Sequence, residues 1–197
     1  FPEISEINEG DEYFLVFEAT QKYDRNYAPA GHVVASEQFQ LDFKEKDNAP
    51  VLDSGKMNAF ESVSNNDAIV EVTGKDGNNN FTIQIDKATG YISTYTYGGH
   101  ALMEQGPTPN YTRAMIDDDM YQTEDRNLYN TAEKFTVSNV TVKESAKLVE
   151  VVVTGSIATA TPSPNTITYQ IFGNGQVIVK NDVTIHSTGS IKRIGMK

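Results

Sequence analysis

The sequence contains no cysteine, no tryptophan and only three histidines among its 197 residues. Without cysteine it can form neither disulfide bonds nor thiolate metal sites, and the redox state of its compartment stays open. No apolar run approaches the length of about 20 residues that a membrane-spanning helix needs. Basic side chains are also scarce, since 16 Lys and Arg stand against 27 Asp and Glu, a net charge of −11. Nucleic acid and anionic membrane surfaces are therefore disfavoured as partners, because both need a basic binding face.

Alternation of apolar and polar residues predicts an antiparallel, all-β chain. Phe81, Ile83 and Ile85 alternate with polar neighbours, which is the pattern of strands with one face in water. Turn signals such as Gly173-Asn174-Gly175 separate paired runs, as hairpin loops do. Strands are predicted over residues 12–20, 31–43, 68–73, 80–86, 90–97, 135–143, 147–157, 165–172, 176–186 and 191–196.

Changes in this pattern divide the chain into three parts. Residues 1–47 hold two predicted strands, too few for a stable domain, so we expect the end of an immunoglobulin-like sandwich whose earlier strands lie upstream. Residues 48–67 show neither periodicity and contain Pro50 and Gly55, the composition of an inter-domain linker. Residues 68–197 form the main β-domain. We expect the whole to be a fragment of a longer protein, because it lacks an initiator methionine and a signal peptide.

One stretch interrupts the strands and carries the most unusual chemistry. It reads Gly-Pro-Thr-Pro-Asn-Tyr-Thr-Arg-Ala-Met-Ile-Asp-Asp-Asp over residues 106–119. Its two prolines and its glycine exclude a helix or a central strand in the first half. Its apolar side chains, Tyr111 among them, favour an ordered loop. Arg113 is spaced to pair with Asp117 or Asp119, and only residues 119–129 are expected to hold a short helix.

This stretch resembles the start of the last domain of the large, multidomain β-galactosidases of glycoside hydrolase family 2. The shared pattern is Gly-Pro-x-Pro-Asn-aromatic-x-Arg-Ala-x-x-Asp-x-Asp, with Met115 where those enzymes usually carry proline and Asp118 where they usually carry asparagine. Three further segments match in the order of the family: residues 30–41, 86–90 and 193–195. The resemblance therefore covers nearly the whole chain.

The resemblance implies both a fold and a role. The fold is a truncated β-supersandwich like that of galactose mutarotase, preceded by the last strands of an immunoglobulin-like sandwich. Both catalytic glutamates, and the ligands of the Mg and Na ions that the family commonly uses, would lie on an upstream TIM barrel. This chain would then hold no catalytic residue, metal ligand or cofactor, and alone it would be inactive. Its partners would be that barrel and, in the intact retaining enzyme, a galactoside, with a homo-oligomer also open.

Two groups of residues are candidates for a functional site. The first lies in the stretch over residues 106–119 and comprises the loop or rim candidates Tyr111, Arg113, Asp117, Asp118 and Asp119. The resemblance places the segment that follows, residues 120–129, near the mouth of the barrel, where we expect a rim or lid element. A purely structural role, in which the arginine satisfies backbone carbonyls, is the simpler alternative. The second is Tyr91, Tyr95 and Tyr97, predicted to share one face of a strand. Such a row can stack on a pyranose, although it more often reflects cross-strand packing.

Other readings carry less support from the residues. His32, His100 and His186 are far apart in the sequence and are expected to be structural. The adjacent carboxylates of residues 117–119 repel one another, which disfavours a catalytic role, and their spacing is not that of an EF-hand Ca²⁺ loop. A free-standing carbohydrate-binding or adhesion module remains the alternative function, followed by a sugar epimerase.

Overall fold

The computed structural model describes residues 11–41, 52–121, 134–159, 161–186 and 191–197. They divide into two compact units, Phe1–Val51 and Leu52–Lys197, and each is described by itself. Nearly all regular structure is antiparallel β-sheet, which confirms the predicted all-β class. No helix among the described residues has the length and apolar character needed to cross a bilayer.

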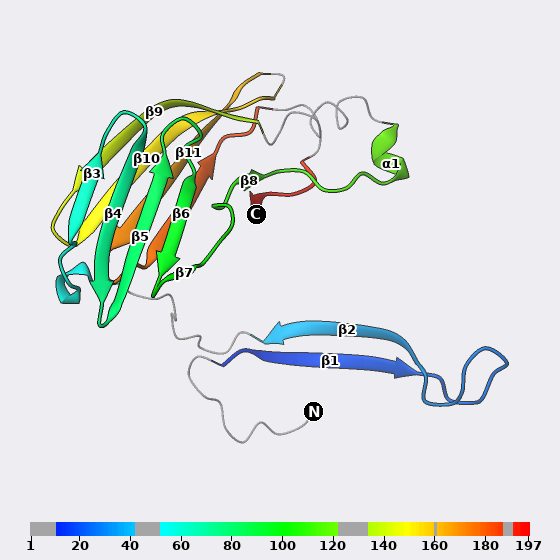
Figure 1. Ribbon diagram of the computed structural model, residues 1–197. Helices are drawn as coiled ribbons and strands as arrows, with labels where there is room; N and C mark the ends of the chain where they lie inside the picture. The colour runs from blue at the N-terminus through cyan, green and yellow to red at the C-terminus, as the bar shows by residue number, and fades with distance from the viewer. Residues whose placement is uncertain (1–10, 42–51, 122–133, 160, 187–190) are drawn as a thin grey trace. The chain divides into compact units, whose positions relative to one another are not determined.

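The described part of the first unit, residues 11–41, forms one hairpin. Strands β1 (Tyr13–Thr20) and β2 (Val33–Leu41) pair along their whole length, as Figure 1 shows. Phe17 and Phe39 meet edge to face with ring centroids 5.9 Å apart. Both rings remain about half exposed, and Ala28 is the only buried residue that the structure describes in this unit. Two strands cannot bury two apolar faces by themselves.

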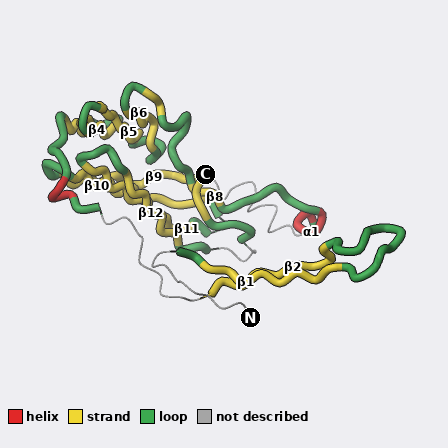
Figure 2. Tube along the Cα trace, turned by 90° about the horizontal axis from the view of Figure 1, so that it is seen from below, coloured by secondary structure: helices red, strands yellow, loops and turns green. Residues whose placement is uncertain are grey.

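The described part of the second unit is built around a β-sandwich of a five-stranded and a four-stranded antiparallel sheet, seen as two layers in Figure 2. The five-stranded sheet has the order β3-β4-β5-β6-β7 and the four-stranded sheet the order β12-β11-β10-β9. The strands of the first are β3 (Ser62–Asn65), β4 (Ile69–Asp76), β5 (Asn79–Asp86), β6 (Ile92–Tyr97) and β7 (His100–Ala101). Those of the second are β9 (Phe135–Glu144), β10 (Leu148–Ile157), β11 (Ser163–Phe172) and β12 (Val177–Val183).

The core lies between these sheets. Each strand contributes every second side chain, because successive side chains of a strand point to opposite faces. The fully buried members come in equal measure from β4, β5 and β6 on one side and from β10 and β11 on the other: Val70, Val72, Phe81, Ile83, Ile85, Ile92, Val149, Val151, Val153, Ile167, Tyr169 and Ile171. The outer faces carry polar residues such as Gln84 and Glu71, which are hydrogen-bonded to each other. The apolar residues that alternate with polar ones in the sequence are thus the residues that form the core.

The segment expected to be a linker contributes to the sandwich, which corrects its boundary at residue 67. A 3₁₀ turn at Ser54–Lys56 is followed by β3, the edge strand of the five-stranded sheet. Phe60 packs edge to face on Phe81, and its N–H donates to the carbonyl oxygen of Ala146 at 2.8 Å. Alternation could not reveal β3, because Val63 is its only apolar residue.

The strand predicted at residues 191–196 has a partner that the sequence did not suggest. Its last part, β13 (Gly195–Met196), pairs with β8 (Pro109–Asn110), which lies inside the stretch of residues 106–119. The proline is tolerated there because β8 has only two residues and one strand neighbour. The predicted helix is a single turn, α1 (Asp117–Met120), while residues 122–129 of that prediction lie outside the described residues.

Candidate functional site

The stretch of residues 106–119, called here the anchor loop, is fixed to the sandwich at its beginning. The N–H of Gly106 donates to the carbonyl oxygen of Ile92 at 3.1 Å. A Cβ atom at this position would collide with that same oxygen, so only glycine fits so close an approach. Two residues later, Thr108 and Lys197 exchange backbone hydrogen bonds of 2.8 and 2.9 Å. Hydrogen bonds to β6 and to the C-terminal residue therefore fix the beginning of the loop, which precedes its charged residues.

Tyr111 is the apolar anchor of the loop. Its side chain is only 1% exposed and packs with Ile157 in a small second core. Its hydroxyl oxygen accepts a hydrogen bond of 2.8 Å from Nδ2 of Asn181. Asn181 in turn accepts one of 2.7 Å from Asn165, which is itself buried. Burial raises the pKa of the Tyr111 phenol, so it stays a neutral acceptor.

Asp119, in the loop, is the centre of a cluster of charged side chains. Its side chain is only 6% exposed, and Oδ2 lies 3.0 Å from a guanidinium nitrogen of Arg113. The ammonium of Lys192 lies 3.3 Å from the other oxygen. Oδ2 also accepts the N–H of Ile116 at 3.0 Å, and Arg113 donates to the carbonyl oxygen of Ala114 at 2.9 Å. One nearly buried carboxylate thus binds the loop, the start of α1 and the C-terminal segment together.

The other two aspartates stay outside this cluster. Asp117 and Asp118 are exposed in the first turn of α1. Of the two partners that the spacing allowed for Arg113, the structure therefore selects Asp119. Acidic residues in the first turn of a helix are favourable, because the N–H groups there carry partial positive charge.

The cluster lowers the pKa of Asp119, and this predicts a pH dependence. The hydrogen bond from the Ile116 N–H lowers this pKa most. Lys192 and Arg113 also lower it, whereas burial raises it. A carboxyl whose folded-state pKa lies below its unfolded one contributes stability above the unfolded value, and this contribution is lost as pH falls through the folded value. Asp119→Asn should therefore lower the thermal midpoint at neutral pH, and its deficit should shrink below about pH 4.

Circular-dichroism melting across this pH range is the measurement, with Asp117→Asn as the control for loss of an exposed charge on the same turn. A deficit that is as large in acid as at neutral pH would show that the charge of Asp119 does not stabilise the fold.

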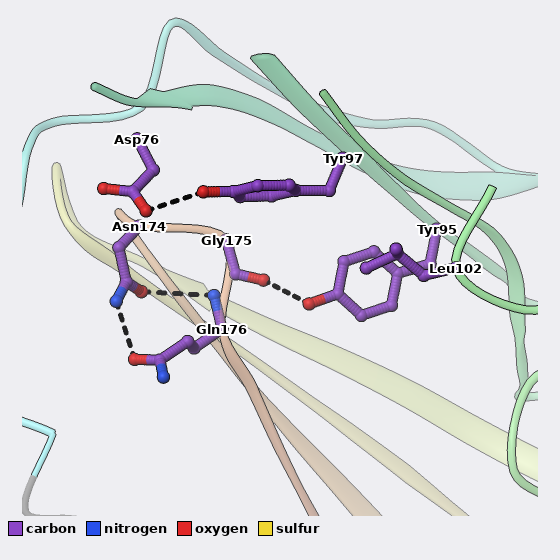
Figure 3. A pocket seen from close by; sticks show the side chains of 7 residues that line it. All are labelled: Asp76, Tyr95, Tyr97, Leu102, Asn174, Gly175 and Gln176. Carbon is purple, nitrogen blue, oxygen red and sulfur yellow. Dashed lines mark hydrogen bonds between the residues drawn. The ribbon is translucent and has the colours of Figure 1, made fainter. Parts of the chain in front are cut away.

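A pocket lies at the C-terminal end of β6, whereas the anchor loop contacts the first residue of this strand. Figure 3 shows Tyr95 and Tyr97 at the pocket, facing the turn between β11 and β12. The Tyr97 hydroxyl donates to Oδ2 of Asp76 at 2.8 Å. The Tyr95 hydroxyl donates to the carbonyl oxygen of Gly175 at 2.6 Å. These two tyrosines are brought together as the sequence suggested. The turn residues opposite them were not foreseen, because only the folded sandwich brings that turn to β6.

Tyr91 lies apart from the other two tyrosines. The pairing of β5 with β6 shifts between Gln84 and Ile85, which leaves Ser93 without a partner residue. This bulge breaks the alternation, so Tyr91 precedes β6 and packs on Phe135 with ring centroids 6.0 Å apart. Burial is the main cause that raises its pKa to about 12. All three tyrosines pack against the main core, but only Tyr95 and Tyr97 line the pocket.

The described residues offer no metal site: they contain no group of three or more His, Asp or Glu side chains that could hold an ion. Of the histidines, His186 lies 3.2 Å from the Pro162 carbonyl oxygen through Nδ1, and its N–H donates to Ser163.

Comparison with known proteins identifies the family of the chain. The sequence profile of the β-galactosidase small chain matches residues 77–197, more than half of the chain, and the profile of β-galactosidase domain 4 matches residues 1–42. A β-galactosidase of Psychromonas ingrahamii is 33% identical over 116 residues, 58% of this chain and 11% of that protein. One of Priestia megaterium is 32% identical over 120 residues, 61% of this chain and 11% of that protein. The chain thus spans about a tenth of the length of these relatives, and it belongs to the β-galactosidase small chain family.

Proposed function

We propose that this chain is a non-catalytic portion of a β-galactosidase, and that its anchor loop shapes the rim of the sugar site of the intact enzyme. The matched profiles and the small share of each relative that the chain covers support this role. Hydrolysis of terminal β-D-galactosides would then be the work of an upstream catalytic barrel.

The observation that carries the rim role is the convergence on Asp119. Arg113, Ile116 and Lys192 all donate to this one carboxylate. Together with the buried Tyr111 they fix where α1 begins, although the loop leaves the two sheets there (Figure 1). A loop that only linked two strands would not need a nearly buried carboxylate held by two cations. Loops fixed in this way are what substrate-positioning elements require.

The hairpin of the first unit supports a partner upstream. Phe14, Val16 and Phe39 are 43–53% exposed although they belong to paired strands. Further strands of the same sandwich would cover these side chains, because a lone hairpin is marginally stable in water. The covering segment would be the rest of the domain whose profile matches residues 1–42.

The chain alone should hydrolyse no β-galactoside. Retaining hydrolysis needs two carboxyl groups about 5 Å apart, one of them kept protonated by a raised pKa. The shifted carboxyl groups among the described residues, Asp119 and Glu150, both have a lowered pKa. A chromogenic galactoside assay on the purified 197-residue chain should therefore give the rate of a buffer blank.

The variants Asp117→Asn and Asp119→Asn are the controls that distinguish hydrolysis by the chain itself from hydrolysis by a contaminating enzyme. Turnover above the blank that either substitution abolishes would show that the chain itself is catalytic and would overturn the proposed role.

A further inference from the structure

We propose that the pocket at the end of β6 binds a single neutral pyranose, at a site separate from the anchor loop. The pocket measures about 310 Å³ and is lined by Asp76, Tyr95, Tyr97, Leu102, Asn174, Gly175 and Gln176 (Figure 3). Its volume is at the lower end of the range for small-molecule sites, roughly 300–1,000 Å³, which suits one sugar ring better than an oligosaccharide.

The pocket offers an apolar surface of the kind that a sugar ring uses. The Tyr97 ring stays partly exposed, and Leu102 is 53% exposed. A pyranose has one face rich in C–H groups, which loses water favourably when it lies on an aromatic ring. The hydrogen bond from Tyr97 to Asp76 fixes the ring, so little side-chain entropy remains to be lost on binding.

The opposite wall supplies polar groups that are already oriented. Nδ2 of Asn174 donates to Oε1 of Gln176 at 2.6 Å, and the Gln176 N–H donates to Oδ1 of Asn174 at 3.1 Å. Gly175 between them has φ +81°, and a Cβ atom there would press on the Phe81 ring, so the turn is held in one shape. Nε2 of Gln176 and Oδ1 of Asp76 form no hydrogen bond with the residues drawn in Figure 3. One can donate to a sugar hydroxyl and the other can accept from one.

The charge and position of the pocket define the ligand class. Asp76 is the only carboxylic acid among the residues that line the pocket, and none of them is Lys, Arg or His, so an anionic sugar would be repelled and a neutral one preferred. The anchor loop touches β6 at Ile92, whereas the pocket uses Tyr95 and Tyr97 at its other end. Binding here therefore does not depend on the rim role proposed above.

Titration of the ¹⁵N-labelled 197-residue chain with methyl β-D-galactoside tests the site. We expect saturable shifts in the millimolar range, confined to the amides of Asp76, Tyr97, Gly175 and Gln176 and their neighbours. Tyr97→Ala should weaken binding at least about tenfold, and Tyr97→Phe less, because it keeps the ring. Gln176→Ala removes a turn donor without touching the core. Tyr27→Ala, at an 81% exposed tyrosine of the first unit, is the matched control and should change nothing.

The spectrum of each variant also reports whether it is folded, so loss of binding can be separated from loss of structure. Galacturonate should bind more weakly than the neutral glycoside, because its carboxylate faces Asp76. Absence of shifts up to about 100 mM glycoside, or shifts that Tyr97→Ala and Gln176→Ala leave unchanged, would overturn the site. Low-micromolar binding at the same amides would support the site and favour a carbohydrate-binding module over a rim element.

Discussion

Replacing Tyr111 by alanine should lower the free energy of unfolding of the sandwich unit by about 3–5 kcal/mol, as for other large buried aromatic side chains. The ring is 1% exposed and packs with Ile157 and, more loosely, with Phe135 and Val183. The truncation leaves a cavity between the anchor loop and the ends of β10 and β12. It also removes the acceptor of the Asn181 amide. Urea unfolding followed by circular dichroism measures the effect.

Tyr111→Phe separates the two contributions. It keeps the packing and removes only the hydroxyl that accepts from Asn181, so it should cost about 1–2 kcal/mol. If the alanine variant were no less stable than the phenylalanine variant, the ring would not anchor the loop, and the small second core would contribute nothing to the fold.

The fold could be predicted largely because the core follows a period of two. Phe81, Ile83 and Ile85 all point into the sandwich, as their alternation indicated. The missed strand β3 shows the limit of the method, since Ser62, Ser64 and Asn65 give no apolar signal. Its place in the sheet is set by pairing with β4. Pairing of that kind depends on a neighbour and leaves no pattern in the strand itself.

The anchor loop was predictable in its local part only. The spacing indicated that Arg113 pairs with Asp117 or Asp119, because all three lie within one short segment, and the structure selects Asp119. Lys192 and Asn181 complete the site from distant segments, and no local pattern points to them. The pairing of β8 with β13 brings these segments together. Long-range pairing, which local periodicity does not encode, therefore decides which residues meet.

Only part of the tyrosine row lines the pocket. Tyr95 and Tyr97 line it and Tyr91 precedes the register shift at Ser93, although all three pack against the main core. A bulge of this kind inserts one residue and reverses the faces of the strand beyond it. Nothing in the sequence around Ser93 marks the bulge.

The proposed rim role predicts that Arg113→Lys, introduced into a β-galactosidase that contains this chain, lowers kcat/KM about tenfold, because small displacements of substrate-positioning elements carry costs of that order or more. Lysine keeps the charge but loses the planar fork with which Arg113 contacts both Asp119 and the Ala114 carbonyl. The anchor loop would then be held less firmly where it leaves the sandwich. On this proposal Arg113 is a positioning residue, and no contact with the substrate is required of it.

The most direct test is therefore steady-state kinetics of the complete enzyme carrying Arg113→Lys, compared with Arg25→Lys as a matched change at an exposed arginine of the first unit. Both variants are assayed at a temperature well below the melting point of each, so that the fraction folded is equal. A loss of kcat/KM in Arg113→Lys, with Arg25→Lys unchanged, is the result that the rim role predicts. Equal kcat/KM in both variants and the unmodified enzyme would contradict it and leave Arg113 as a residue that only stabilises the fold.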